Sequence, residues 1–172
     1  SNTQLLPQQL QILAAEFLTS WQEQCTHLTM TEVCVNVKLL HALLNQIPIV
    51  SCEYWRHLIK AAKGGKPLPN AAEFVPPCGE ALLQLGLQQL HPNSQRNELF
   101  KGVKFVFMHQ RQLESYGPII EKAGGVSLAL KSGVGKTTLL KPNVCVIEYI
   151  PNMQSQSFGT VKVISGKSYN IY

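Results

Sequence analysis

The sequence lacks the segments that mark a membrane or secreted protein. No apolar run approaches the roughly 20 residues that a helix needs to span a bilayer. The first residues, SNTQLLPQQ, have neither the charged flank nor the apolar stretch of a secretory signal. The chain also has no initiator Met, so we expect a piece of a longer protein. These absences predict a protein with no membrane partner.

Cysteine and acidic residues are too few and too scattered for the common metal and catalytic sites. The five cysteines lie far apart without a C-x-x-C pair, which argues against a disulfide framework and a zinc ribbon. Cys25 and His27 are close, but no second ligand pair at zinc spacing follows. Acids number only 10, and no Ser/His/Asp, Cys/His or paired-carboxylate set appears at a spacing typical of catalysis. We therefore expect a reduced intracellular protein that is not an enzyme and holds no cofactor or metal.

The composition nevertheless supports a folded, basic protein. Hydrophobic residues make up 45% of the 172 residues, which is enough for a packed core. The net charge of +5 fits nucleic acid or a phosphorylated partner. Lys60, Lys63 and Lys66 form the one loose cationic cluster, beside Arg56 and His57. A solvated helix end explains this cluster equally well, so direct DNA binding stays open.

The first half of the chain alternates helices and short strands. Leu10, Leu13, Ala14 and Phe17 follow helical spacing and predict an amphipathic helix. The predicted elements after it are a strand over 25–30, a helix over 37–46 capped by Asn36, a strand over 47–50, and a helix after Ser51 that ends at Gly64–Gly65.

The second half repeats this alternation after a proline-rich stretch, 64–97, that holds one short predicted helix near 81–90. The predicted elements are a strand over 103–108, a helix over 113–123 closed by Gly124–Gly125, and strands over 126–130 and 144–150. Strands that alternate with helices imply a mostly parallel sheet with flanking helices. The sequence therefore predicts the α/β class, in two similar halves.

The string LKSGVGKTTLL, 130–140, is similar to a phosphate-binding loop. Its Lys131, Gly133, Gly135, Lys136 and Thr137 fit a variant of the motif, except that Ser132 stands where the variant has a glycine. The ordinary form fails because Leu130 occupies its first glycine position. The motif requires a following helix whose N-terminus binds phosphate. Pro142 leaves room for about one helical turn. We interpret the string as a basic loop and keep a nucleotide hydrolase acting through 131–138 as a remote alternative.

Several blocks of the sequence together resemble a tandem pair of BRCT repeats. The blocks are CTHLTM, IPIVSCEYWRHLIKA with Trp55 in its helix, FKGVKFVFM, and a helix that ends in AGG. The resemblance implies two small parallel sheets flanked by helices. It is nearest to the BRCT pair of an adaptor in a nuclear complex for DNA double-strand-break repair and checkpoint signalling.

The resemblance also implies a division of the chain. Repeat 1 occupies 1–64 and lacks its first strand, a proline-rich linker occupies 65–99, and repeat 2 occupies 100–172 with an incomplete or atypical C-terminal end. Ala14–Ala15 stand where the family usually has Gly–Gly. The tail 151–172 predicts a loop with a hairpin around Ser165–Gly166. The fork-head-associated domain that precedes the repeats in such adaptors is absent from this sequence.

One lysine is unusual on physical grounds alone. Lys38 follows the Asn36 cap, at a helix N-terminus whose dipole disfavours a cation and attracts a phosphate. BRCT pairs that bind phosphoserine place a lysine at this point and a Ser or Thr near the first strand, which implies Lys38 and Thr3 as the phosphopeptide-binding residues. A solvated Lys38 is the alternative. His27 and Trp55 are predicted to be structural.

The resemblance further implies the partners. These are phosphorylated DNA-damage-response proteins in the nucleus, at chromatin and damage sites, bound with help from the cleft between the repeats. Nuclease and ATPase subunits of the repair complex would bind other parts of the parent protein. A scaffold that binds proteins without phosphate is the second hypothesis.

Overall fold

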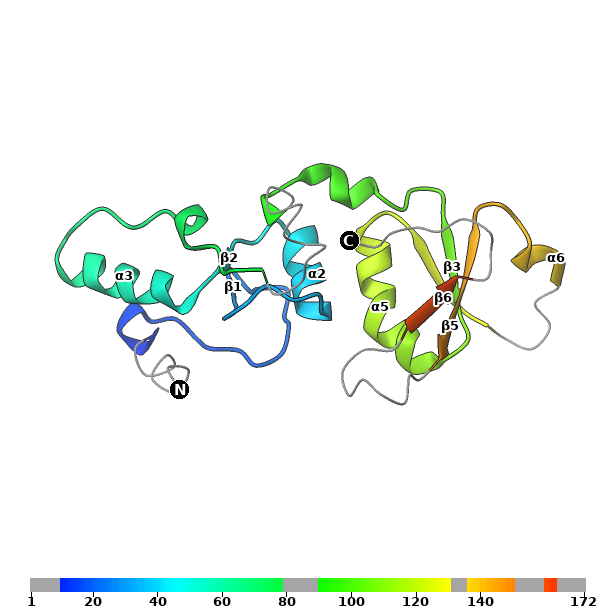
Figure 1. The fold of residues 1–172 in the computed structure, drawn as a ribbon, viewed down its shortest axis with the longest axis horizontal. Coiled ribbons are helices and arrows are strands. Elements are labelled where there is room, and N and C mark those ends of the chain that lie inside the picture. Colours follow the sequence, from blue (N-terminus) through cyan, green and yellow to red (C-terminus); the bar gives the residue numbers. More distant parts are fainter. Residues whose placement is uncertain (1–9, 79–89, 131–135, 151–159, 164–172) are drawn as a thin grey trace. The chain divides into compact units, whose positions relative to one another are not determined.

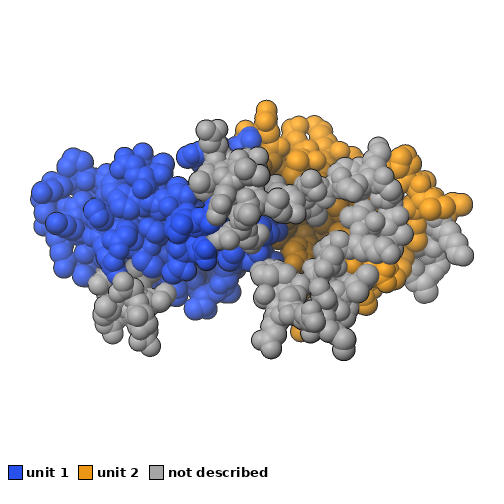
Figure 2. All heavy atoms as spheres, in the orientation of Figure 1, with its two compact units in different colours: residues 1–93 blue, residues 94–172 orange. Residues whose placement is uncertain are grey.

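The structure consists of two compact units, Ser1–Asn93 and Ser94–Tyr172 (Figure 2). The computed structural model describes residues 10–78, 90–130, 136–150 and 160–163. Each unit has its own parallel strands and its own buried residues (Figure 1). The predicted α/β class is confirmed in both units. Among the described residues, every helix is too short or too polar to cross a bilayer.

A two-stranded parallel sheet organises the first unit. Strand β1 (Leu28–Thr29) pairs with β2 (Ile49–Val50), with Leu28 opposite Ile49. Helix α2 (Val37–Leu44) connects the two strands, as the pattern predicted. Its Asn36 cap is confirmed, because the Asn36 side chain accepts a 2.9 Å hydrogen bond from the Leu39 backbone N–H.

Helix α3 (Cys52–Lys63) follows β2 directly and ends at Gly64, as predicted. The Ser51 side chain makes no capping hydrogen bond to it, unlike the expected cap. Tyr54 and Trp55 on α3 pack with Val50 and Leu10 in one buried cluster. A second cluster joins α2 to the strands through the buried residues Val33, Leu39, Ala42 and Ile49.

The predicted N-terminal helix does not reach Phe17. Among the described residues this segment is helical only at Leu10 and in the short 3-10 helix η1 (Gln11–Leu13). Ala14 adopts a left-handed backbone conformation with φ 52°, which ends the helix. Left-handed geometry at a non-glycine residue costs about 1–2 kcal/mol because Cβ crowds the following carbonyl. Glycine would adopt this conformation without that cost.

Part of the proline-rich stretch packs on the first unit. The 3-10 helix η2 (Ala71–Phe74) places Phe74 against Tyr54, with ring centroids 5.8 Å apart. The Ser51 N–H donates to the Phe74 carbonyl at 2.8 Å, and the Val33 N–H donates to Pro77 at 2.8 Å. Residues 71–78 are therefore integrated in the first unit. The division of the chain into repeat 1 (1–64), linker (65–99) and repeat 2 (100–172) stays a prediction. The helix expected near 81–90 falls outside the described residues except at its last residue.

A four-stranded sheet of order β4-β3-β5-β6 organises the second unit (Figure 1). The strands are β3 (Lys104–Phe107), β4 (Val126–Ala129), β5 (Val144–Ile150) and β6 (Thr160–Val163). Strand β3 runs parallel to both β4 and β5, whereas β6 is antiparallel to β5. The mostly parallel sheet is confirmed. The hairpin expected around Ser165–Gly166 lies outside the described residues.

Helix α5 (Gln110–Lys122) connects β3 to β4 and begins three residues before the predicted start. The predicted glycine cap is present, since Gly124 has φ 83°. Any Cβ at Gly124 would also lie 2.8 Å from the carbonyl oxygen of Asn97, which belongs to the 3-10 helix η4 (Ser94–Glu98). The buried residues Phe105, Phe107, Ile119 and Ile120 join α5 to the sheet.

Candidate functional site

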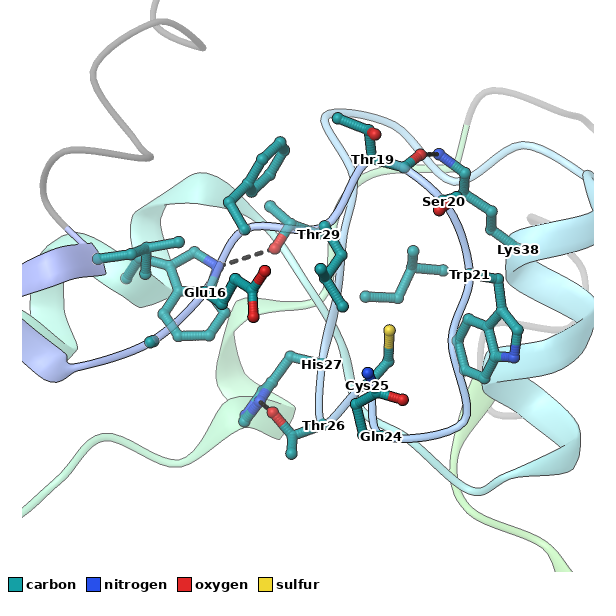
Figure 3. A pocket seen from close by; sticks show the side chains of 16 residues that line it. Glu16, Thr19, Ser20, Trp21, Gln24, Cys25, Thr26, His27, Thr29 and Lys38 are labelled. Carbon is teal, nitrogen blue, oxygen red and sulfur yellow. Dashed lines mark hydrogen bonds between the residues drawn. The ribbon is translucent and has the colours of Figure 1, made fainter.

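Lys38 is the second residue of α2 and lies exposed at its N-terminus. No acidic residue occupies the first turn of this helix. The positive end of the helix dipole and the Lys38 ammonium therefore lie at the same place, and together they favour the binding of an anion. The Lys38 ammonium donates a hydrogen bond to the backbone carbonyl of Thr19, which holds its head over the segment before β1 (Figure 3).

A hollow of about 460 Å³ opens beside Lys38. The chain from 15 to 29 forms most of its wall, and α2 and α3 contribute Lys38 and Trp55 (Figure 3). The hydroxyl residues along this wall are Thr19, Ser20, Thr26 and Thr29. Hydroxyl groups and a lysine ammonium are donors that suit a phosphate. The arrangement can therefore bind an anionic group at the Lys38 end and a short chain segment along the hollow.

Stacked rings support the Lys38 end of the hollow. The Trp21 indole stacks on the His41 ring of α2, with centroids 5.1 Å apart and planes 9° apart. His41 is buried, and Trp21 lines the hollow. This stack joins the wall segment to the same helix that carries Lys38. It therefore keeps Thr19 and Ser20 close to the helix N-terminus, although residues 15–27 of the wall have no regular secondary structure.

His27 and Trp55 form the other end of the hollow. The His27 ring lies 5.3 Å from the Tyr54 ring and 5.1 Å from the Trp55 ring, between centroids. Burial lowers the pKa of His27 below 6.5, because the apolar rings disfavour the charged imidazolium. The Trp55 N–H donates to the Thr29 hydroxyl at 2.8 Å, and Trp55 is only 8% exposed. Both residues thus have the structural environments that the sequence predicted.

The sequence indicated one end of this site and missed the rest. Lys38 is at the predicted helix start, whereas Thr3 lies outside the described residues. Thr19, Ser20 and Trp21 were not predicted as site residues. Their segment carries no motif or periodicity. The one related signal in the sequence was Asn36, which predicted the start of the helix that these residues approach and which caps that helix at 2.9 Å in the structure.

The nucleotide-binding string has little of the required architecture in the described residues. Helix α6 (Lys136–Leu139) has four residues, which agrees with the single turn that Pro142 allowed. Strand β5 begins at Val144, soon after it. Residues 131–135 lie outside the described residues. The residues that the structure describes contain no group of three His, Cys, Asp or Glu side chains placed to hold a metal ion.

Sequence comparison relates the chain to one family. Residues 94–165 match the family described as the second BRCT domain on Nijmegen syndrome breakage protein. The chain is 32% identical over 144 residues to nibrin of Gallus gallus and 34% identical over 146 residues to nibrin of Danio rerio. These matches cover 83% and 84% of this chain but only 19% and 18% of the two nibrins. The chain thus corresponds to about a fifth of its curated relatives.

Two solved structures share the fold. The BRCT5-BRCT6 domains of S. pombe Brc1 match with a TM-score of 0.58 at 18% identity, covering 83% of this chain and 69% of that one. The S. pombe Nbs1 FHA/BRCT-repeat domain matches with a TM-score of 0.52 at 16% identity, covering 81% and 46%. The predicted tandem BRCT architecture is therefore confirmed.

Proposed function

Because this chain belongs to the nibrin family of tandem BRCT regions, we propose that it is a non-catalytic adaptor that binds phosphorylated proteins in DNA double-strand-break repair. The feature that supports this proposal most directly is the exposed Lys38 at the N-terminus of α2, beside a hollow rich in hydroxyl groups. The proposal includes a role in checkpoint signalling and a location in the nucleus, at chromatin and sites of DNA damage.

The phosphate is the part of the ligand that this site suits best. A phosphorylated side chain carries a charge of about −1.5 to −2 at neutral pH and three acceptor oxygens. Lys38 would exchange its bond to the Thr19 carbonyl for a charge-assisted bond to phosphate, which is stronger than a neutral hydrogen bond. The positive end of the helix dipole would add to it. A hydroxyl from Thr3 is part of the same proposal.

The partner residues flanking the phosphate would lie along the hollow toward His27 and Trp55. The hollow extends from the N-terminus of α2 to α3. One of its walls is formed by the backbone from Ala15 to Thr29. An extended peptide can pair with such a wall through backbone hydrogen bonds. We propose phosphorylated DNA-damage-response proteins as partners, with the nuclease and ATPase subunits of the repair complex bound by other parts of the parent protein.

A phosphate-independent scaffold is the second candidate, and one contact favours it. Lys38 already has a partner in the Thr19 carbonyl, so its role can be to hold the wall segment in place. In that case the same surface would bind a protein with equal affinity whether or not it is phosphorylated.

Titration with matched peptides separates the two functions. The chain would be titrated with a degenerate phosphoserine peptide pool and with the same pool unphosphorylated, using fluorescence anisotropy. The phosphate-binding proposal predicts preference for the phosphorylated pool. Lys38→Met should reduce that preference about tenfold, equivalent to about 1.4 kcal/mol.

Lys60→Met provides the control, because Lys60 is an exposed lysine on α3 that does not line the hollow. It removes the same charge and should leave the preference unchanged. Equal binding of both pools by the unaltered chain would support the scaffold function. A preference that survives Lys38→Met would remove Lys38 from the phosphate site.

A further inference from the structure

The second unit contains a cluster of lysines that the sequence disperses. Lys104 begins β3, Lys122 ends α5, and Lys141 lies three residues before β5. All three side chains are exposed. They are called the amino-edge lysines below, because the fold brings them to the edge of the sheet where the parallel strands begin.

Backbone contacts establish this proximity. The Lys104 N–H donates to the Asn143 carbonyl at 2.8 Å, two residues from Lys141. The Phe100 N–H donates to the Ala123 carbonyl at 2.8 Å, which holds the end of α5 next to the turn before β3. In register, Lys104 lies opposite Val126 on one side and Val144 on the other. Figure 1 shows the strand starts and the end of α5 together at the upper edge of this unit.

Acidic residues only partly offset this edge in the part of the chain that the structure describes. Of the two glutamates near it, Glu98 pairs with Lys101 at 3.4 Å, whereas the Glu121 carboxylate accepts a bond from the Ser127 hydroxyl at 2.5 Å and keeps its charge. Neither forms a described ion pair with an amino-edge lysine. The helix dipole accounts for a lysine at the end of α5. It does not account for Lys104 within a strand. Like charges at neighbouring positions repel, so a bound anion would relieve this repulsion.

We propose that the amino-edge lysines bind the phosphate backbone of duplex DNA, independently of its sequence. Adjacent strands lie about 4.8 Å apart, so Lys104 on β3 and Lys141 just before β5 stand at neighbouring strand starts, and Lys122 ends the helix that leads into β4 on the other side of β3. This spacing suits several phosphates along one backbone. Lysine is a compact point charge that contacts phosphate without demanding a fixed geometry.

The charge distribution favours DNA over a short acidic peptide. Residues 94–172 carry ten Lys and Arg against four Glu, whereas residues 1–93 carry five against six. The positive excess therefore extends over the second unit as a whole. Such a field attracts a long polyanion and raises its association rate. This surface is separate from the Lys38 hollow of the first unit.

The test uses the whole chain and a fluorescent duplex of random sequence, titrated between 50 and 200 mM salt. Three phosphate contacts predict a slope of about −2.7 for log affinity against log salt, which is about a 40-fold loss over this range. The triple variant Lys104→Gln, Lys122→Gln, Lys141→Gln should bind at least tenfold more weakly at 50 mM salt, with a slope near zero. Arginine at the same three positions should retain binding.

The control variant Lys60→Gln, Lys63→Gln, Lys66→Gln removes the same charge from α3 and the residues that follow it. It should bind DNA as the unaltered chain does, and amide spectra should show that both triple variants are folded. Unchanged binding by the amino-edge variant, or an equal loss in the control, would overturn the proposal. So would tighter binding of a polyglutamate peptide of equal charge, which would indicate an acidic protein partner. Lys38→Met should leave DNA binding intact, which keeps this test separate from that of phosphopeptide binding.

Discussion

The indole N–H of Trp55 on α3 donates a 2.8 Å hydrogen bond to the hydroxyl of Thr29 on β1. Because Trp55 is only 8% exposed, this bond satisfies a donor that is largely removed from water. It also ties the helix to the strand at one end of the hollow (Figure 3). The strength of this connection can be measured by mutation.

Thr29→Val should lower the free energy of unfolding by about 1–3 kcal/mol. The valine keeps the shape of the side chain but leaves the Trp55 N–H unpaired and buried. Thr29→Ser keeps the hydroxyl and should cost distinctly less. Urea denaturation followed by circular dichroism provides the measurement, and equal losses in the two variants would show that the hydrogen bond is not the cause.

Asn36→Ala should destabilise the first unit by about 1 kcal/mol through loss of the α2 cap. The Asn36 side chain accepts from the Leu39 N–H at 2.9 Å, whereas the Ser51 side chain makes no such bond to α3. Ser51→Ala is therefore the matched control and should change stability less. Thermal unfolding of both variants tests this, and the larger loss in Ser51→Ala would contradict the assigned caps.

Ala14→Gly should raise the free energy of unfolding by up to about 1 kcal/mol, because glycine adopts a φ of 52° without steric cost. Ala15 has no positive φ, so Ala15→Gly should instead destabilise by adding freedom to the unfolded chain. Opposite changes in the urea midpoint are expected. Two changes of the same sign would argue against the left-handed conformation at Ala14.

Stability should fall in acid through His27. Burial lowers the pKa of the folded ring below 6.5, so the unfolded state binds more protons as the pH falls through that value. The free energy of unfolding therefore decreases as the pH falls through 6.5, while well above pH 6.5 both states are neutral and His27 contributes no pH dependence. His27→Gln should flatten the curve between pH 7.5 and 5.5, measured by urea denaturation. Parallel curves for the two proteins would exclude His27 as the source.

The sequence by itself determined the local elements and one end of the site. Apolar periodicity predicted α2, α3 and β5, and the short-range chemistry of Asn36 and Gly124 predicted where helices begin and end. These features depend on neighbours within a few residues. The position of Lys38 at a helix N-terminus could be predicted for the same reason.

Only the tertiary structure decided what surrounds those elements. The wall of Thr19, Ser20 and Trp21 has no regular structure, and it lies beside Lys38 through the stack of Trp21 on His41. Lys104 and Lys141 are separated by 37 positions yet share one sheet edge, because parallel pairing aligns the starts of β3 and β5. Such contacts depend on how distant segments pack, and no local pattern of residues encodes them.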